Sequence, residues 1–257
     1  MNYFSQDDHN AVISISAEGA QGATSLQQVY NRMTNLHRNL SSRLKSHGYT
    51  LHTNPAMPMG VGQSSIVAPN NGDTMTLTYM RSQTDAMVVE RVMGRDELTQ
   101  SGAEVQRHPV IELRLTPDHF VAELVVGPEA WYDQRNFLGK FTIKEHRHQL
   151  FKLLTNLDDE YCVGFWSGLH LNDMHLSTRR LPPPHILFDF IETFAAGRDY
   201  LRIGRWYDVG DPSLNEDTIV HELFNRVRDL YDIYEYILWT SNNNFHTFFE
   251  RAYIAVR

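Results

Sequence analysis

The segment Pro109–Val126, PVIELRLTPDHFVAELVV, restricts the fold of this chain more than any other stretch. Apolar and polar residues alternate on both sides of TPDH, as they do in β-strands that bury one face. Proline and aspartate at the centre favour a tight turn, so the segment predicts an antiparallel β-hairpin. The apolar pairs that this hairpin would form are Leu115 with Phe120, Leu113 with Ala122, and Ile111 with Leu124.

The same register places Glu112 directly opposite Glu123. Like charges in this position destabilise a sheet, so water, Arg114 on the same face, a bound cation or a raised carboxyl pKa must offset the repulsion. We expect this face to be solvated, because antiparallel sheets often have one face in water. Glu90 would join it if residues 86–93, AMVVERVM, formed the preceding strand. Alternatively, the carboxylates hold Mg²⁺ or Mn²⁺, or act as general acid and base, which makes Glu112 and Glu123 candidate catalytic residues.

The rest of the chain predicts an α+β fold. Further strands are predicted at residues 74–80, 86–93, 161–168 and 200–207, and helices at residues 25–48, 128–140, 143–157, 182–197 and 211–241. We therefore expect an antiparallel sheet of about five or six strands, packed against several helices, with a long C-terminal helix. The sequence shows no linker and no internal repeat, so residues 1–257 are predicted to form one domain, with residues 1–24 as a loose N-terminal arm.

The stretch AGRDYLRIGRWYDVG, residues 196–210, concentrates arginines on a predicted strand. A guanidinium group can hold two oxygens of a phosphate or carboxylate, so these arginines and two more in a nearby loop are candidate anion ligands. The candidates are Arg179, Arg180, Arg198, Arg202 and Arg205. Arg202 and Arg205 would point to opposite faces of the strand unless Gly204 marked a bulge. Ion pairs with neighbouring acidic residues are the alternative interpretation.

Histidines suggest a second kind of site. His170, Asp173 and His175 lie together in the loop HLNDMH and are candidate ligands for zinc or a related metal, although their spacing matches no established motif. The sequence contains no P-loop, GxGxxG, GxSxG or HExxH motif, so it indicates no particular cofactor. Cys162 lies in the apolar stretch YCVGFW, which predicts a buried structural cysteine with a raised thiol pKa.

Charge and composition bear on partners and location. The formal net charge is −8, so nucleic acid is not an expected partner. The single cysteine suits a reducing compartment. The N-terminus does not resemble a signal peptide, and no apolar run is long enough to span a membrane, so we expect a cytoplasmic protein without membrane contact. Tyr236 and Trp239 fall off the apolar stripe of the last helix. Exposed aromatics there would indicate a protein interface, such as that of a homodimer. We expect instead that residues 245–256, FHTFFERAYIAV, fold back over them, because these residues also need burial.

Two functions are compatible with these features. The first is a binding or interaction domain that takes a small anionic ligand through the arginine-rich strand. The second is a metal-dependent hydrolase of phosphorylated small molecules, with Glu112 and Glu123 on the sheet face. The absence of a catalytic motif favours the first function.

Overall fold

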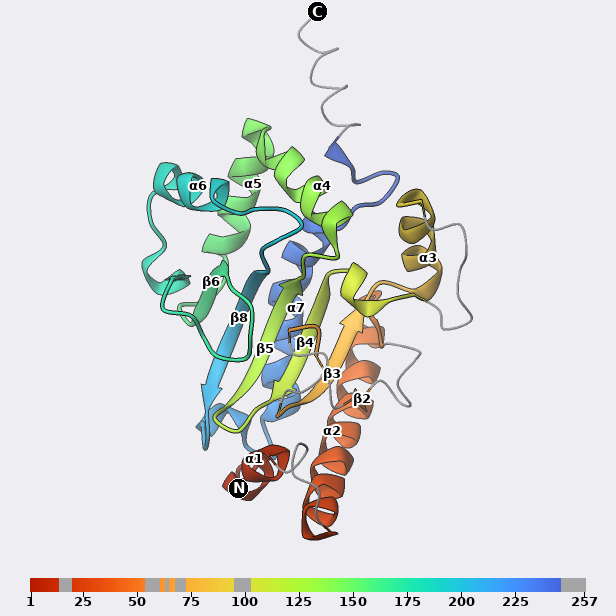
Figure 1. The fold of residues 1–257 in the computed structure, drawn as a ribbon. Coiled ribbons are helices and arrows are strands. Elements are labelled where there is room, and N and C mark those ends of the chain that lie inside the picture. The colour runs from red at the N-terminus through yellow and green to blue at the C-terminus, as the bar shows by residue number, and fades with distance from the viewer. Residues whose placement is uncertain (14–19, 54–60, 63–64, 68–72, 95–102, 246–257) are drawn as a thin grey trace, which may run out of the picture.

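The structure is a computed structural model that describes residues 1–13, 20–53, 61–62, 65–67, 73–94 and 103–245. It confirms the predicted α+β class, with helices arranged around an antiparallel sheet (Figure 1). The helices are α1 Gln6–Ile13, α2 Ala20–Ser46, α3 Gln83–Val92, α4 Trp131–Phe141, α5 Lys144–Thr155, α6 Pro184–Glu192 and α7 Ile219–Ile237. The strands are β1 His52–Thr53, β2 Val61–Gly62, β3 Met75–Met80, β4 Val110–Leu115, β5 His119–Val126, β6 Tyr161–Phe165, β7 His175–Ser177 and β8 Leu201–Asp208. No helix in the described part of the chain combines the length and apolar character needed to cross a bilayer.

The sheet runs in the order β1-β3-β4-β5-β8-β6-β7, and β2 also pairs with β3. All pairings are antiparallel. The predicted hairpin is confirmed as β4 and β5, with Glu112 opposite Glu123 and Leu113 opposite Ala122. The last strand, β8, is inserted between β5 and β6, so it places the arginine-rich stretch in the middle of the sheet.

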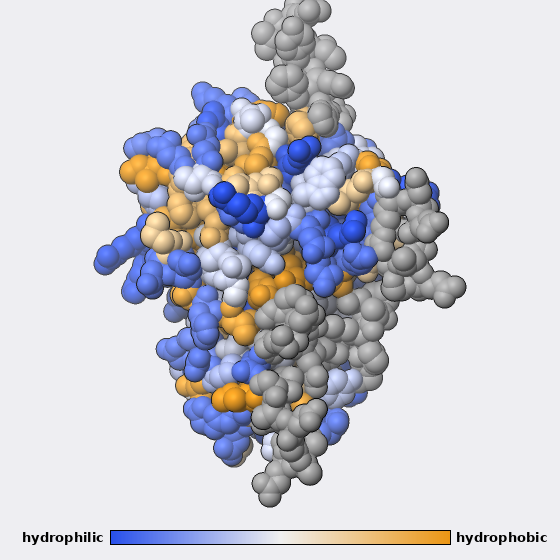
Figure 2. Space-filling view, in the orientation of Figure 1, coloured by the Kyte–Doolittle hydropathy of each residue, from blue (hydrophilic) through white to orange (hydrophobic). Residues whose placement is uncertain are grey.

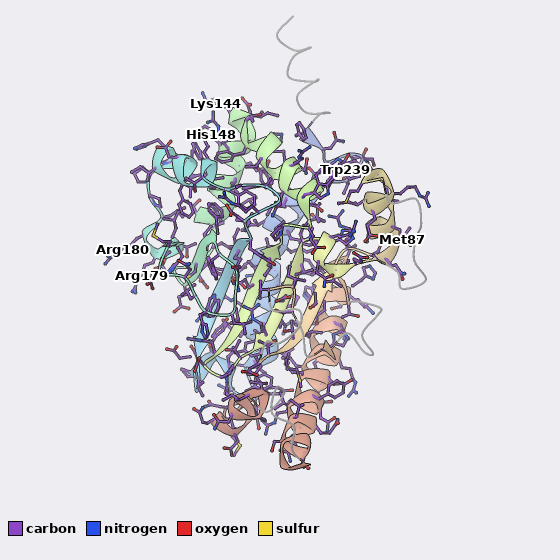
Figure 3. All side chains as sticks on the ribbon, viewed as in Figure 1. Met87, Lys144, His148, Arg179, Arg180 and Trp239 are labelled. Carbon is purple, nitrogen blue, oxygen red and sulfur yellow. The ribbon has the colours of Figure 1, made fainter. Side chains whose placement is uncertain are left out.

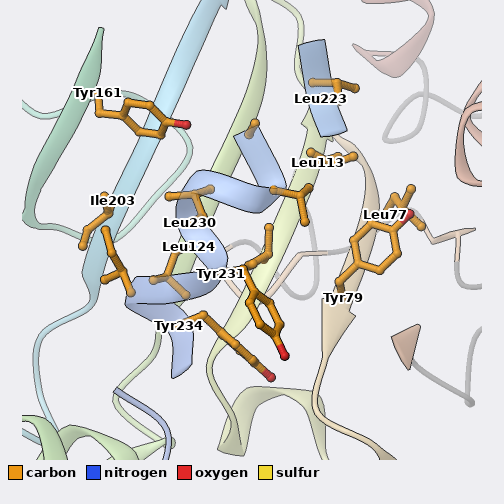
Figure 4. Packing of buried hydrophobic residues seen from close by; sticks show 14 of the residues in the cluster. Leu77, Tyr79, Leu113, Leu124, Tyr161, Ile203, Leu223, Leu230, Tyr231 and Tyr234 are labelled. Carbon is orange, nitrogen blue, oxygen red and sulfur yellow. The ribbon is translucent and has the colours of Figure 1, made fainter. Parts of the chain in front are cut away.

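The main core lies on one face of the sheet, against α2 and α7. The helix α2 buries an apolar stripe at three- and four-residue spacing, made of Val29, Met33, Leu36, Leu40 and Leu44. The helix α7 lies behind the sheet in Figure 1, and Figure 4 shows its residues Leu223 and Leu230 close to Leu113 and Leu124 of the hairpin. Each fully buried leucine in this layer contributes about 1.5–3 kcal/mol relative to an exposed one.

The opposite face of the sheet is also buried, so the expectation of a solvated face was wrong. Every residue of β4 is buried, and so is every residue of β5 after His119. Ile66 from one loop and Leu169 from another pack with Val110 and Val125 in a second apolar cluster. Loops, and not an amphipathic helix, bury this second face. The alternation of apolar and polar residues in the strands therefore did not predict its burial.

Residues 86–92 are helical, which corrects the strand predicted at residues 86–93. They belong to α3, which begins after Ser82, and the Ser82 side chain accepts a hydrogen bond from the backbone N–H of Asp85. This N-cap satisfies one of the N–H groups left free at the start of a helix. Ala86 and Val89, three residues apart, are the apolar side chains that α3 buries. Helical spacing therefore decides the structure here, although adjacent valines favour strands.

The N-terminal residues 1–13 pack against the sheet and do not form the predicted loose arm. The ring of Phe4 stacks on Phe120 with a centroid separation of 5.3 Å. His9 Nδ1 lies 2.7 Å from the backbone oxygen of Thr116. Both partners belong to the turn end of the β4–β5 hairpin, about a hundred residues away in sequence, so local patterns gave no sign of these contacts.

Polar residues on α4 fix the C-terminal end of α7. Asn136 and Lys140 are both buried and lie one helical turn apart. Asn136 Nδ2 donates to the backbone oxygens of Ile237 (3.0 Å) and Leu238 (3.1 Å), and Lys140 Nζ donates to that of Tyr236. The last carbonyls of a helix lack partners within the helix, so α4 supplies the cap from a neighbouring element.

Candidate functional site

Four charged side chains meet on the second face of the sheet. Glu112 and Arg114 lie on β4, Glu123 on β5 and Arg202 on β8, and each is 0% exposed. Arg114 donates through Nη1 to Glu112 Oε2 (2.7 Å) and through Nη2 to Glu123 Oε2 (3.1 Å). Arg202 Nη2 donates to the same Glu123 oxygen at 2.5 Å. We call these four residues the sheet-face network, in which two positive and two negative formal charges cancel.

Two glycines make room for this network. Gly204 lies opposite Glu123 and Gly164 lies opposite Arg202, so neither position places a side chain over its charged neighbour. A Cβ on Gly164 would lie 2.6 Å from the ring of Trp166, which shows how closely the indole covers this point of the strand. The pairing of β8 continues through Gly204 on both sides, so the bulge considered there does not occur.

Two indole rings enclose Arg202. Its guanidinium carbon lies 4.8 Å from the ring centroid of Trp166 and 5.7 Å from that of Trp206. Trp206 is also 5.7 Å from the guanidinium carbon of Arg114. Rings in these positions attract the cations and exclude water from them. Neither tryptophan was predicted as a site residue, although strand alternation already placed Trp206 on the same face as Arg202.

N–H donors outnumber acceptors around the network. On the arginines of the network and the two tryptophans beside them, four buried N–H groups have no hydrogen-bond partner among the described residues: Nε of Arg114, Nε of Arg202, and Nε1 of Trp166 and of Trp206. Of the carboxylate oxygens of the network, Glu123 Oε1 is the one that has no hydrogen-bond partner among the described residues. A buried donor without a partner costs about 1–3 kcal/mol. Four such donors close together therefore indicate a place where a ligand or ordered water supplies acceptors.

Burial also shifts the ionisation of groups on this face. It raises the pKa of Glu112, and the neighbouring Arg114 opposes that shift. It lowers the pKa of Arg202, against the opposing effect of Glu123. Burial, reinforced by Glu123, raises the pKa of the Cys162 thiol to about 11. The thiol is therefore protonated at neutral pH, as expected of a structural cysteine.

The carboxylates are held by arginines rather than left open to a metal ion. Arg114 bridges Glu112 and Glu123, so the repulsion expected between them is offset within the protein. The third carboxylate considered for this site, Glu90, lies on α3 and accepts a hydrogen bond from the backbone N–H of Glu104 (2.8 Å). The geometry therefore does not favour the metal-dependent hydrolase, and the catalytic roles of Glu112 and Glu123 stay predictions.

Arg205 belongs to a separate network on the other face of β8, as strand alternation predicted. It donates to Glu222 Oε1 (3.0 Å) and forms ion pairs with Glu160 and with Asp158. Arg226 shares both Glu222 and Asp158. Arg226 also lies 3.6 Å from Asp229, so four carboxylates surround the two guanidinium groups. This excess of negative charge does not suit an anion.

The remaining candidate arginines lie apart from the sheet-face network. The side chain of Arg198 is 77% exposed and pairs with Asp199 at 3.1 Å. Arg179 and Arg180 are exposed in the short 3₁₀ turn Thr178–Arg180, at the left edge of the molecule in Figure 3. Of the five arginines proposed as anion ligands, the structure places one, Arg202, in the network.

The candidate metal ligands are not gathered into a site. His170 and Asp173 are exposed, and the Nδ1 atom of His175 lies 2.6 Å from the backbone oxygen of Asn172. Among the residues that the structure describes, no group of three or more His, Cys, Asp or Glu side chains is placed to hold a metal ion.

The aromatic residues near the end of α7 do not form the exposed interface considered as an alternative, and residues 246–256 of the segment predicted to fold back over them lie outside the described residues. Tyr236 is buried, and its hydroxyl donates to the backbone oxygen of His146 at 3.1 Å. Trp239 is half-buried and packs edge-on against Tyr132, with a centroid separation of 5.0 Å. On the face seen in Figure 2, hydrophobic and hydrophilic surfaces are interleaved over α4, α5 and α6. Scattered apolar residues of this kind do not indicate a partner surface.

No protein-family model and no curated protein sequence matches the chain. The geometry of the sheet-face network is therefore the basis on which a function can be proposed.

Proposed function

We propose that this protein binds a small anionic molecule at the sheet-face network. The N–H groups of Arg114, Arg202, Trp166 and Trp206 are the donors. The observation that carries this proposal is the excess of four unpartnered buried N–H groups over the one unpartnered carboxylate oxygen of the network. Arginine and tryptophan side chains donate but cannot accept, so they cannot satisfy one another. An oxyanion brings several hydrogen-bond acceptors into a small volume and can therefore satisfy the unpartnered N–H groups.

The carboxylates have a positioning role in this proposal. Glu123 accepts one hydrogen bond from Arg114 and one from Arg202, and these hold both guanidinium groups in fixed orientations. Because the formal charges of the network cancel, a bound anion adds negative charge to a neutral group rather than to an acidic one. Hydrogen bonds between charged partners are about twice as strong as those between neutral ones, so fixed guanidinium donors favour an anion over an uncharged molecule.

The contacts of the network suggest where the anion enters. Trp206 and Gly168 are partly exposed, so this end of the face reaches the surface. The backbone oxygen of Gly168 accepts a hydrogen bond from Arg202 Nη1 at 2.6 Å. An oxyanion arriving from this side approaches the indole N–H groups of Trp166 and Trp206.

The test is calorimetric titration and thermal shift with phosphate, sulfate, citrate, sugar phosphates and nucleotides. Binding at a hundred times the dissociation constant should stabilise the fold by about 2.7 kcal/mol. Trp206→Phe keeps the ring beside the arginines but removes one donor, and should weaken binding about tenfold or more. Trp131→Phe is the matched control, because Arg135 lies 5.0 Å over its ring outside the network. The proposal fails if none of these anions binds, or if both variants bind as the unmodified protein does.

A further inference from the structure

The sheet-face network leaves one carboxylate oxygen unpartnered beside its unpartnered N–H groups. Glu123 Oε2 accepts hydrogen bonds from Arg114 and from Arg202, whereas Oε1 of the same carboxylate has no hydrogen-bond partner among the described residues. The Glu123 side chain is fully buried. A buried acceptor without a partner costs free energy, as a buried donor does. A ligand that satisfies this site therefore has to supply one donor as well as several acceptors.

The thiol of Cys162 lies on this face of the sheet but does not supply that donor. Cys162 is opposite Gly204, which is in turn opposite Glu123, and residues paired in this way share one face. The thiol is protonated at neutral pH, because burial, reinforced by Glu123, raises its pKa to about 11. A thiol is a weak donor, and no hydrogen bond joins it to Glu123 Oε1. The oxygen is therefore left to a donor that arrives with the ligand.

The unpartnered oxygen and the unpartnered N–H groups belong to one cluster. Glu123 is hydrogen-bonded directly to the guanidinium groups of Arg114 and Arg202. The ring of Trp206 lies 5.7 Å from the guanidinium carbon of each of these arginines. One small molecule can therefore meet the carboxylate oxygen and the N–H groups at the same time.

We propose that the sheet-face network selects an oxyanion that keeps a proton, of which inorganic phosphate is the simplest, over a fully ionised one such as sulfate. This inference rests on the proposed function and names the class of anion. The P–OH group of phosphate donates to Glu123 Oε1, and the other phosphate oxygens accept from the N–H groups of the arginines and tryptophans. An ionised carboxylate accepts but does not donate, so sulfate would place an oxygen against Oε1 with no proton between them. Two buried negative oxygens in contact repel each other.

The experiment is calorimetric titration of the full chain with phosphate, arsenate, sulfate and selenate in mildly alkaline buffer. All four are then tetrahedral dianions, but only phosphate and arsenate keep a proton. Phosphate should bind at least a hundredfold more tightly than sulfate, and arsenate than selenate, because a site built around a hydrogen bond discriminates strongly against an analogue that cannot make it. The second pair separates the effect of the proton from that of ion size. Methyl phosphate loses its last proton near about pH 6, so it should bind as weakly as sulfate, which distinguishes free phosphate from a phosphate ester.

Glu123→Gln provides a second measurement. Its amide oxygen can accept from the two arginines, which turns the amide N–H₂ group toward the ligand, so the preference for phosphate over sulfate should disappear. Glu112→Gln is the comparison, because both oxygens of Glu112 already accept hydrogen bonds, from the backbone N–H of Ile66 at 2.8 Å and from Arg114 at 2.7 Å. It should change the affinities for phosphate and for sulfate by the same factor.

Equal affinities of the unmodified protein for phosphate and sulfate would overturn this inference and leave the proposed function standing, with water as the donor to Glu123 Oε1. An undiminished preference for phosphate in folded Glu123→Gln would overturn it as well. Failure of every anion to bind would overturn the proposed function too. Circular dichroism checks that the variants fold, and if Glu123→Gln does not, the four anions on the unmodified protein decide the question.

Discussion

Glu123 lies directly over Gly204, across the pairing of β5 with β8. A Cβ on Gly204 would lie 2.7 Å from both Cβ and Cγ of Glu123 and 2.8 Å from the backbone oxygen of Ala122. Distances this short cannot be relieved by a side-chain rotation alone, because a backbone atom is among the contacts. The glycine is therefore what allows a buried carboxylate to reach the two arginines.

We expect Gly204→Ala to destabilise the fold by about 1–3 kcal/mol, the usual cost of an added methyl group in a packed interior. Gly197→Ala is the comparison, because Gly197 has a φ of +77° but a Cβ added there would have no neighbour within 4 Å. It should cost only the strain of a left-handed alanine, about 1 kcal/mol. Urea denaturation measures both. Equal losses in the two variants would show that close approach to Glu123 is not the deciding factor.

The two carboxylates of the network should differ in their effect on stability. Glu123 accepts from both Arg114 and Arg202, so Glu123→Gln leaves two buried cations poorly paired and should cost about 3–5 kcal/mol. Glu112 accepts from one arginine, and burial raises its pKa, so Glu112→Gln should cost about 1–2 kcal/mol. Chemical denaturation compares the variants. Stabilisation by either change would mean that repulsion between the carboxylates outweighs their contacts with arginine.

Asn136 should be intolerant of a nearly isosteric change. Its Nδ2 atom donates to three backbone oxygens, those of Ile237, Leu238 and Asn243. Asn136→Asp replaces this donor with an oxygen facing carbonyls and should cost about 2–4 kcal/mol. Asn35→Asp is the control, because Asn35 is exposed and its Oδ1 only accepts, from Arg38. A similar loss in both variants, measured by thermal denaturation, would contradict the capping role of α4.

Lys140 should make stability depend on pH in the alkaline range. Burial lowers its pKa from 10.5 to about 8. Between these two values the unfolded chain binds more protons than the folded one, so the free energy of unfolding rises with pH. The gain from pH 8 to 9.5 should be about 1–2 kcal/mol. Urea denaturation at both pH values should show this gain, and Lys140→Met should lack it. An equal gain in the variant would assign the effect to other groups.

The hairpin register could be predicted because it depends on residues close together in the sequence. The pairing of Glu112 with Glu123 follows from the turn and from strand alternation alone. The same alternation placed Arg202 and Arg205 on opposite faces, as the structure has them. These relationships need no information from distant segments.

The environment of the network could not be predicted in this way. Its burial depends on residues far from the hairpin in sequence, such as Ile66 and Leu169, which cover the second face. The role of Trp166 depends on the pairing of β6 with β8, which no local pattern specifies.

The insertion of β8 between β5 and β6 has a consequence for the growing chain on the ribosome. Leu201, the first residue of β8, is made 75 positions after Val126, the last residue of β5. At synthesis rates of 5–20 residues per second, the edge of β5 that pairs with β8 stays unpaired for about 4–15 s. An unpaired edge can add a strand from another chain. Nascent copies of this protein should therefore be most prone to mispairing, and most dependent on chaperones, during this interval.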